Sequence, residues 1–440
     1  MEQATEPTGG SRSNRAGDDP GDCCGGGHDS PALSLEQARE RILDAVSPVA
    51  GSERMPLMQA LGRVLSEPVI AGMDVPAHTN SAMDGYALRS ADVATAGIRL
   101  QQVGTSFAGR PFSGSVAAGQ CVRIMTGAVM PDGADSVVMQ ERTRVEGEFV
   151  VFDQAPASGA NVRPAGEDIA RGDQVLEPGR WLTAADLGLL ASLGFAEVSV
   201  RQRPRVAFFS TGDELRPVGQ ALGAGQIHDS NRYTLFGLLT ELGMDLLDLG
   251  IVEDTPEALS GALNKAADCD AVITTGGVSV GDADYVLEAL EKAGSVGFWQ
   301  VAMKPGRPLA FGRIGQALFF GLPGNPVSAM VTFMQLARPA LVKLAGSRPA
   351  EPLCMRLAAT EAIRKKPGRR EFQRGRLSFV DGNLVVEPLG HQGSGVLRSM
   401  SRADCFINLG PTEGRVEAGD LVTVEPFAQA IWNGEQRSIE

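Results

Sequence analysis

The feature that most constrains the fold is an alternation of strand-like and helix-like segments that begins at Arg205. Short apolar runs (RVAFFS, MDLLDLGIV and DAVITT) alternate with segments whose apolar residues recur at helical spacing (SNRYTLFGLLTEL, TPEALSGALNKAA and DADYVLEALEKA). The helix edges agree, since Asn231 or Ser230 can cap the first, Thr255 with Pro256 starts the second, and Gly294 follows the third. This order predicts βαβ units, and therefore a parallel-rich sheet with helices on both faces.

The segments that follow complete this α/β region. Two more strand-like runs, VGFWQVAM and PLAFG, precede the turn LFFGLPG and a long predicted helix from about Asn325 to Leu344. After Gly346 the pattern returns to short strands ending at VTVEPF, which predicts a separate small C-terminal β domain.

The region before Arg205 is predicted to be mixed. A capping box, S-L-E-Q, starts a helix at Ser34, and a second short helix is predicted with Leu57, Leu61 and Leu65 on one face. From about residue 71 to 200, short β-type segments such as CVRIM, DSVVMQ and FVVFD are separated by Gly, Pro and Asp, which favours one mixed β domain or two entwined small ones. The segment LTAADLGLLASLG within this region predicts a helix that ends at Gly194.

Residues 1–31 are rich in Gly, Ser, Asp and Pro and poor in apolar residues, so we expect a disordered tail. Cys23, Cys24 and His28 lie in this tail, but the glycines between them leave nothing to hold a metal geometry, and we favour no site there. The expected division is therefore a tail at 1–31, an N-terminal region of two entwined subdomains at 32–200, an α/β domain at 201–347 and a β domain at 350–428.

Charge and composition exclude several functional classes. The net charge of −13 disfavours broad nucleic-acid binding, which needs a concentrated basic face. No apolar run approaches the roughly 18 residues that cross a bilayer, and no secretory signal is visible, so we expect a cytoplasmic protein without a membrane partner. Six scattered cysteines without a CxxC pair favour reduced thiols over a disulfide framework or a zinc cage.

The stretch VITTGGVSVGDADYV, residues 272–286, lies where a parallel sheet binds its ligands, beyond the carboxyl end of a strand. Thr275, Gly276 and Gly277 leave the strand, and small residues let phosphate groups approach the backbone amides. Neither GxGxxG nor GxxxxGK[ST] is present. Asp282 and Asp284 follow, and they either face phosphate through an intervening Mg²⁺ or merely cap the next helix. From this stretch alone both interpretations stand.

Other loops at the same predicted edge favour a site. Glu214 in STGDEL and Asp254 after LDLGIV place acids at two more strand ends, which resembles a cation site better than three separate caps. Six of the 40 basic residues are lysine, and KPGRP sets Lys304 beside Arg307 at a rigid turn, which favours anion binding over a solvated surface. GLPGNP places Pro326 at the first turn of the long helix, with exposed amides aimed at a nearby anion.

Three polar loops of the N-terminal half remain open on physical grounds: TNSAMDGYAL, RIMTGAVMPDGADSVVMQE and NVRPAGEDI. Asp84 with Gly85, and Thr126 with Gly127, are compatible with ordinary hairpin turns. Arg163 is compatible with a surface salt bridge to Glu167 or Asp168, which contributes little.

Taken together, these motifs resemble the MoeA family, the molybdopterin molybdenumtransferases of molybdenum-cofactor synthesis, also represented by the E domain of gephyrin. The resemblance runs from about Leu33 to Phe427 and rests on seven motifs in the family's order: TNSAMDGYA, RIMTGAVMPDGADSVVMQE, GEDI, STGDEL, TTGGVSVGDADY, MKPGRPLAFG and GLPGNPVSA. It implies α/β plus β architecture, with a central molybdopterin-binding α/β domain, N-terminal mixed domains and a small C-terminal β-barrel.

The resemblance also implies an activity and an assembly. The enzyme would take adenylyl-molybdopterin and molybdate, split the adenylyl linkage with Mg²⁺, and yield molybdenum cofactor and AMP. The expected assembly is an elongated homodimer in which the α/β domain of one subunit faces N-terminal loops of its partner. A molybdopterin adenylyltransferase is the expected pathway partner.

Site residues carry over by motif. The catalytic group comprises Asp84, Thr126, Asp168, Glu214, Asp254, Asp284 and Lys304, of which Glu214, Asp254 and Asp284 are the expected Mg²⁺ ligands. The substrate-binding group comprises Arg163, Thr275, Gly276, Gly277, Ser279, Arg307, Pro323, Pro326, Arg374 (in FQRG) and Ser394 (in HQGS). Asp282 remains a helix-start residue.

One position departs from some bacterial relatives, which carry a second lysine where this chain has Gln300. The site therefore lacks one positive charge, and either molybdate binds more weakly or another base replaces that lysine. Two other functions are less consistent with the sequence. A molybdopterin adenylyltransferase is disfavoured because it is typically the α/β domain alone, and a scaffold of gephyrin type is disfavoured because no partner-binding linker is evident and the acids and lysine are retained.

Overall fold

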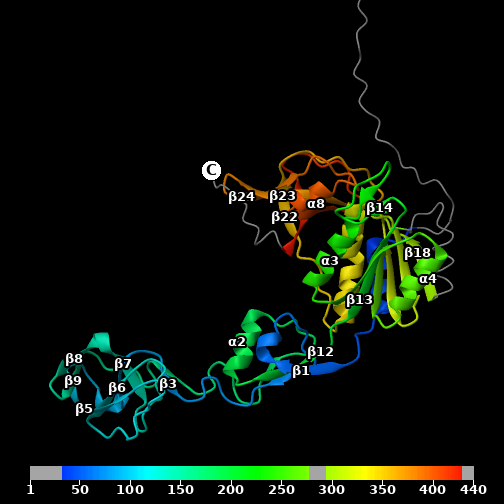
Figure 1. Cartoon of the computed structure of the whole chain (residues 1–440). Helices are drawn as coiled ribbons and strands as arrows, with labels where there is room; N and C mark the ends of the chain where they lie inside the picture. Colours follow the sequence, from blue (N-terminus) through cyan, green and yellow to red (C-terminus); the bar gives the residue numbers. More distant parts are fainter. Residues whose placement is uncertain (1–31, 277–293, 429–440) are drawn as a thin grey trace, which may run out of the picture.

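The computed structural model describes residues 32–276 and 294–428. The chain is elongated, with a sheet domain at one end, a small intermediate domain, and an α/β domain that contacts a β-barrel at the other end (Figure 1). None of the helices in these residues is long and apolar enough to cross a membrane.

The α/β domain is built on a six-stranded sheet of order β16-β13-β17-β21-β20-β18. The first four strands are parallel, and β20 and β18 run antiparallel to their neighbours. The strands are β13 (Arg205–Thr211), β16 (Asp245–Val252), β17 (Ala271–Thr275), β18 (Gly294–Gln300), β20 (Pro308–Ile314) and β21 (Ala317–Leu322). The parallel-rich sheet predicted from the alternating pattern is thus confirmed.

Helices cover both faces of this sheet. On one face, buried residues of α1 (Leu35–Asp44), α3 (Asn231–Glu241), α6 (Pro326–Thr332) and α7 (Arg338–Leu344) join Phe208 and Ile273 in one core. On the other face, α4 (Pro256–Lys265) packs Leu259 against Phe209. Because strand side chains alternate in direction, consecutive residues of β13 supply the two cores.

Helix boundaries follow local capping, with two differences from expectation. Ser34 forms the predicted capping box for α1, and Thr255 caps α4. The cap of α3, however, comes from Asp229, whose Oδ1 accepts from the backbone N–H of Arg232, and not from Ser230 or Asn231. The predicted long helix after Asn325 is interrupted by a π-helical segment, η4 (Phe333–Ala337), between α6 and α7.

The C-terminal domain is a closed five-stranded barrel, as the resemblance implies. Its strands are β22 (Met355–Ala359), β23 (Arg370–Val380), β24 (Asn383–Pro388), β25 (Cys405–Leu409) and β26 (Leu421–Pro426), joined by α8 (Leu397–Arg402). The ring closes because β23 pairs with both β24 and β25, while β22 pairs with β24 and β26. The short strand β19 (Met303–Lys304) adds to β23 from outside the ring.

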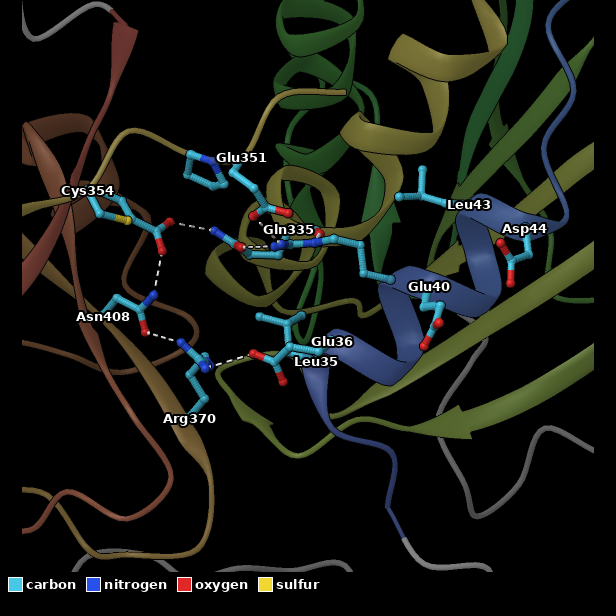
Figure 2. Close-up of a pocket in the computed structure, with 13 residues that line it drawn as sticks. Leu35, Glu36, Glu40, Leu43, Asp44, Gln335, Glu351, Cys354, Arg370 and Asn408 are labelled. Atoms are coloured by element: carbon cyan, nitrogen blue, oxygen red, sulfur yellow. Dashed lines mark hydrogen bonds and ion pairs between the residues drawn. The ribbon is translucent and has the colours of Figure 1, made fainter. Parts of the chain in front are cut away.

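A polar network fixes the barrel against the α/β domain (Figure 2). Arg370 of the barrel donates to Glu36 of α1 at 2.7 Å, and the buried Gln335 of η4 donates to Glu425 at 2.9 Å. These contacts border a cavity of about 550 Å³ between α1, η4 and the barrel. None of the predicted site residues lines this cavity.

The intermediate and distal domains are formed by two passes of the chain. The intermediate domain pairs β1 (Ser52–Pro56) with β12 (Glu197–Arg201) and β2 (Val69–Ile70) with β11 (Gln174–Leu176), beside α2 (Ala184–Ser192). The distal domain contains a six-stranded sheet of order β7-β4-β6-β5-β9-β8. The strands of this sheet are β4 (Gly85–Leu88), β5 (Ile98–Ser106), β6 (Gln120–Ile124), β7 (Ser136–Met139), β8 (Thr143–Glu146) and β9 (Phe149–Phe152). A separate pair is formed by β3 (Asn80–Ser81) and β10 (Val162–Arg163).

The second short helix predicted over Leu57, Leu61 and Leu65 is wrong. Only a 3₁₀ turn, η1 (Leu57–Gln59), forms there. The backbone N–H groups of Gly62 and Leu65 donate to carbonyls of the returning strand segment near residue 181, so they cannot close helical hydrogen bonds. Leucine spacing alone did not reveal this tertiary pairing.

Candidate active site

The carboxyl ends of three parallel strands meet at one edge of the central sheet. Thr211, Thr275 and Leu322 end β13, β17 and β21, which are hydrogen-bonded neighbours. Gly276 turns away at φ +88°, and its N–H donates to the Leu322 carbonyl at 3.2 Å. The start of α3 joins this edge because Asn231 Nδ2 donates to the Gly324 carbonyl at 2.7 Å. The loops that carry the predicted site residues therefore converge.

Acids gather on one side of this edge. Thr211 Oγ1 donates to Asp254 Oδ1 at 3.4 Å, which ties the loop after β16 to the end of β13. Partial burial of the carboxyl, and then the negative charges of Asp213 and Glu214, raise the pKa of Asp254 although the residue as a whole is exposed. The three carboxylates of Asp213, Glu214 and Asp254 therefore lie close enough to repel one another. No cationic side chain of the described residues contributes to the pKa shift of Asp254. Asp213 was not among the sequence-predicted site residues, and its place next to Glu214 in STGDEL was the available signal.

Two of the three expected Mg²⁺ ligands, Glu214 and Asp254, lie among the described residues. No group of three or more His, Cys, Asp or Glu side chains is arranged as a ready metal cage within residues 32–276 and 294–428. The third predicted ligand, Asp284, lies outside the described residues, as do Gly277, Ser279 and Asp282.

Lys304 lies on the barrel side of the same region. As the last residue of β19 it pairs with Glu371 of β23, and its Nζ lies 3.8 Å from Glu371 Oε1. The lysine is exposed, while Glu371 is buried. Arg307, three residues on, donates from Nη2 to Gln300 Oε1 at 2.8 Å. Gln300, the departure noted in the sequence, therefore orients the neighbouring guanidinium.

Arg374 is buried, with 1% of its surface exposed, and burial lowers its pKa to about 10. No carboxylate forms an ion pair with it among the residues that the structure describes. Its guanidinium donates to Ser399 Oγ at 3.0 Å and to the carbonyls of His391 and Gly393 at 3.3 and 3.2 Å. The arginine thus holds the 391–393 loop by hydrogen bonds that leave its charge uncompensated.

That loop links the barrel to α6. The backbone N–H of Val327, in the first turn of α6, donates to the Ser394 carbonyl at 3.0 Å. Pro323 and Pro326 flank this helix start. Lys304, Glu371 and Arg374 line one cavity of about 400 Å³, which is formed by barrel residues together with Lys304 and Pro305. Glu371 was missed by sequence reasoning, because nothing in FQRG marks the preceding glutamate as a partner for a lysine far along the chain.

In the distal domain, two predicted residues meet. Thr126 donates to Asp84 Oδ1 from its backbone N and from Oγ1, both at 2.7 Å. These two hydrogen bonds, backbone first, hold the pKa of Asp84 below its ordinary value. The two motifs that resembled separate hairpin turns therefore build one loop cluster.

Arg163 and Asp168 are exposed and lie on the return path toward the intermediate domain. Asp168 donates its backbone N–H to the Val75 carbonyl at 3.0 Å. No ion pair joins Arg163 to Glu167 or Asp168 in the described part of the chain, so the surface salt bridge considered for them does not form here.

The turn at Gly276 supports a stability prediction. A Cβ at this position would lie 2.2 Å from the Thr211 carbonyl oxygen, and φ is +88°, so Gly276→Ala is expected to lower the free energy of unfolding by about 1–3 kcal/mol. Urea denaturation measures this. The matched control is Gly261→Ala in α4, where no atom lies within 4 Å and alanine favours the helix. Equal stability of the two variants would contradict the close approach at Gly276.

Three family models cover the chain in order: the MoeA N-terminal region (domains I and II) at residues 33–194, a probable molybdopterin binding domain at 207–343, and the MoeA C-terminal region (domain IV) at 356–427. A molybdopterin molybdenumtransferase of Haemophilus influenzae is 44% identical over 399 residues, which are 90% of this chain and 98% of that protein. The chain belongs to the MoeA family. The prediction of a transferase of molybdenum-cofactor biosynthesis, acting on a molybdopterin substrate, is confirmed at this level.

Two further likenesses agree with MoeA membership. Gephyrin of Dictyostelium discoideum is 34% identical over 459 residues, covering 91% of this chain and 63% of that protein. The crystal structure of a molybdopterin biosynthesis MoeA protein from Pyrococcus horikoshii superposes with a TM-score of 0.79 at 27% identity, covering 90% of this chain and 100% of that one. The MoeA fold therefore extends over all the described domains.

Proposed function

We propose that this MoeA-family chain inserts molybdenum from molybdate into adenylyl-molybdopterin, with Mg²⁺-dependent release of AMP. One observation carries the proposal. The start of α6 is joined to both sides of the proposed site, since Gly324 accepts from Asn231 at the sheet edge near the acids, and Val327 donates to Ser394 beside the barrel loop that Arg374 holds. This arrangement suits a reaction with two anionic substrates. The Mg²⁺-bound pyrophosphate of adenylyl-molybdopterin would lie at the acidic sheet edge, and molybdate would bind near the basic residues of the barrel.

The acidic side suits a divalent cation. Partial burial, and then the charges of Asp213 and Glu214, raise the pKa of Asp254. A hard cation held by Glu214 and Asp254, with Asp284 as the third expected ligand, would relieve the repulsion among these carboxylates. When bound there, Mg²⁺ would neutralise the pyrophosphate and stabilise the charge that develops as its bond breaks. Thr211 keeps Asp254 oriented toward the strand edge through its hydroxyl.

The basic side suits molybdate. Arg374, one of the residues that line the cavity, carries a buried positive charge without a carboxylate partner among the described residues, and Lys304 carries a second, exposed one. Both side chains donate hydrogen bonds and accept none, which matches the acceptor-only oxygens of an oxyanion. Glu371 lies 3.8 Å from Lys304, holds the ammonium at the cavity wall and limits its net attraction. Arg307, oriented by Gln300, is the nearest additional base in sequence.

We also propose a homodimer with a shared site. Asp84 and Thr126 lie in the distal sheet domain, at the opposite end of the chain from the central sheet (Figure 1). If they serve the same reaction as Asp254, a second copy must bring them there. Sedimentation velocity at micromolar concentration is expected to give twice the chain mass of 46.2 kDa, and a monomer would contradict this.

Complementation tests the sharing directly. Asp84→Asn and Asp254→Asn homodimers are each expected to be inactive, whereas a statistical mixture of the two chains forms dimers with one intact site and recovers roughly a quarter of the wild-type activity. Two inactive parents without recovery in the mixture would show that both residues act within one chain.

The deciding assay supplies purified protein with adenylyl-molybdopterin, Mg²⁺ and molybdate, and follows AMP release together with activation of an apo-molybdoenzyme. Molybdate-dependent AMP release is expected. Its absence would overturn the proposal, and ATP-dependent adenylation of molybdopterin would support an adenylyltransferase instead. The substrate itself requires an adenylylating enzyme upstream, so a molybdopterin adenylyltransferase remains the expected pathway partner.

A further inference from the structure

Three buried polar side chains form a hydrogen-bonded chain beneath the turn at Gly276. Ser210, Thr275 and Asp229 are 0%, 1% and 1% exposed. The oxygens of Ser210 and Thr275 are 3.1 Å apart, and Ser210 Oγ donates to Asp229 Oδ1 at 3.0 Å. We call these three residues the buried relay. Asp229 and Ser210 have no part in the reaction described above.

The hydrogen bonds of the buried relay all run the same way, from Thr275 through Ser210 to Asp229. An aspartate carboxylate only accepts hydrogen bonds, and a serine hydroxyl has a single hydrogen to donate. Ser210 gives that hydrogen to Asp229, so the hydrogen between Ser210 and Thr275 must come from Thr275. The hydroxyl of Thr275, the last residue of β17, is therefore held in one orientation by Asp229 acting through Ser210.

The relay joins three elements at the candidate site. Ser210 lies near the end of β13, Thr275 ends β17, and Asp229 caps α3 by accepting from Arg232 N at 3.1 Å. Ser210 and Thr275 lie on the face of the sheet that α3 covers, because they follow Phe208 and Ile273 by two residues. The start of α3 is thereby fixed relative to the point where the chain leaves the sheet.

Helix capping alone does not account for an aspartate at this position. Asp229 Oδ2 is buried and has no hydrogen-bond partner among the described residues. A buried unsatisfied oxygen lowers stability, and a serine caps a helix without burying a carboxylate. Unsatisfied buried groups of this kind call for an explanation beyond folding.

We propose that Asp229 is a positioning residue for substrate binding, which acts through Ser210 on Thr275 and sets the direction in which the chain leaves β17 at Gly276. The inference rests on the proposed function and adds two residues to its site. A turn that contacts the substrate equally before and during reaction contributes to binding and not to the chemical step. Loss of the relay is therefore expected to raise KM for adenylyl-molybdopterin while kcat changes little.

The chain offers a matched pair of variants on consecutive residues. Thr275→Val removes the donor of the relay and is expected to raise KM about tenfold, with kcat within about threefold of wild type. Thr274→Val is the control, because Thr274 is also buried, points to the opposite face, and has a hydroxyl without a hydrogen-bond partner among the described residues. Its KM is expected to stay unchanged. Equal KM values for the two variants would overturn the proposal, whatever their melting temperatures.

A second pair tests Asp229 itself. Asp229→Asn retains an oxygen for Ser210 and for Arg232 N, so its KM is expected to stay within about threefold of wild type, whereas Asp229→Ala is expected to match Thr275→Val. An asparagine variant as impaired as the alanine variant would overturn the relay. Equilibrium binding of adenylyl-molybdopterin, followed by pterin fluorescence, gives the same comparison without turnover. Failure of AMP release by the wild type would then count against the proposed function only.

Discussion

Asp254→Asn is expected to lower kcat for molybdate-dependent AMP release by about a hundred- to a thousandfold, the range seen when one preorganised charge-stabilising group is removed. The substitution keeps the size of the side chain and removes the charge that a divalent cation would neutralise beside Asp213 and Glu214. The Mg²⁺ concentration for half-maximal activity is expected to rise at least about tenfold in the same variant, by the loss of one anionic oxygen ligand. Steady-state kinetics across a Mg²⁺ series measures both values. Asp284→Ala is expected to abolish turnover in the same way.

The control for this variant is Glu253→Gln, an exposed acid in the same loop that is not among the residues shifting the pKa of Asp254. Glu253→Gln removes an equal charge one residue away. Because a surface charge is screened by salt, both kcat and the Mg²⁺ concentration for half-maximal activity are expected to stay within about twofold of wild type. Circular dichroism should show intact folding for both, since Asp254 is exposed and, within residues 32–276 and 294–428, its side chain has one long hydrogen bond, from Thr211. Full turnover of Asp254→Asn at limiting Mg²⁺ would show that this acid is structural.

Arg374→Met is expected to raise KM for molybdate about 10- to 100-fold, because a charge-assisted hydrogen bond contributes about 1.5–3 kcal/mol. Methionine retains a long, flexible side chain that fills the buried space without the charge. KM for adenylyl-molybdopterin is expected to change less than about threefold, since the acid-lined edge lies on the other side of the α6 start. Kinetics with each substrate varied in turn separates the two effects.

Loss of the bonds from Arg374 to the 391–393 loop also affects stability, so two further variants isolate the charge. Arg374→Lys keeps the charge but not the fork of donors, and an intermediate KM for molybdate is expected. Arg376→Met, on the same strand with an exposed side chain, should leave that KM unchanged. If Arg374→Met and Arg376→Met share the wild-type KM for molybdate, the buried guanidinium serves only to hold its loop.

Segments with strong local patterns could be predicted from the sequence. The apolar runs of β13, β16 and β17 and the helices α3 and α4 lie where the sequence pattern indicated. Local chemistry also placed the caps at Ser34 and Thr255. The leucine spacing before residue 66 misled, because those backbone groups pair with a segment more than a hundred residues away. Periodicity reports which side chains are buried, and not which strand a backbone pairs with.

For the candidate site too, the sequence and the tertiary structure supplied different information. Motif chemistry by itself determined the kinds of residue involved: acids at strand ends, a rare lysine at a rigid turn, and a helix start open to anions. Only the tertiary structure decided which of them meet: Asp84 with Thr126, Lys304 with Glu371, and the loop held by Arg374 with the start of α6. It also revealed the relay from Thr275 through Ser210 to Asp229. The physical reason is that residue type is a local property of the chain, whereas distance between charges and donors depends on how strands and domains pack together.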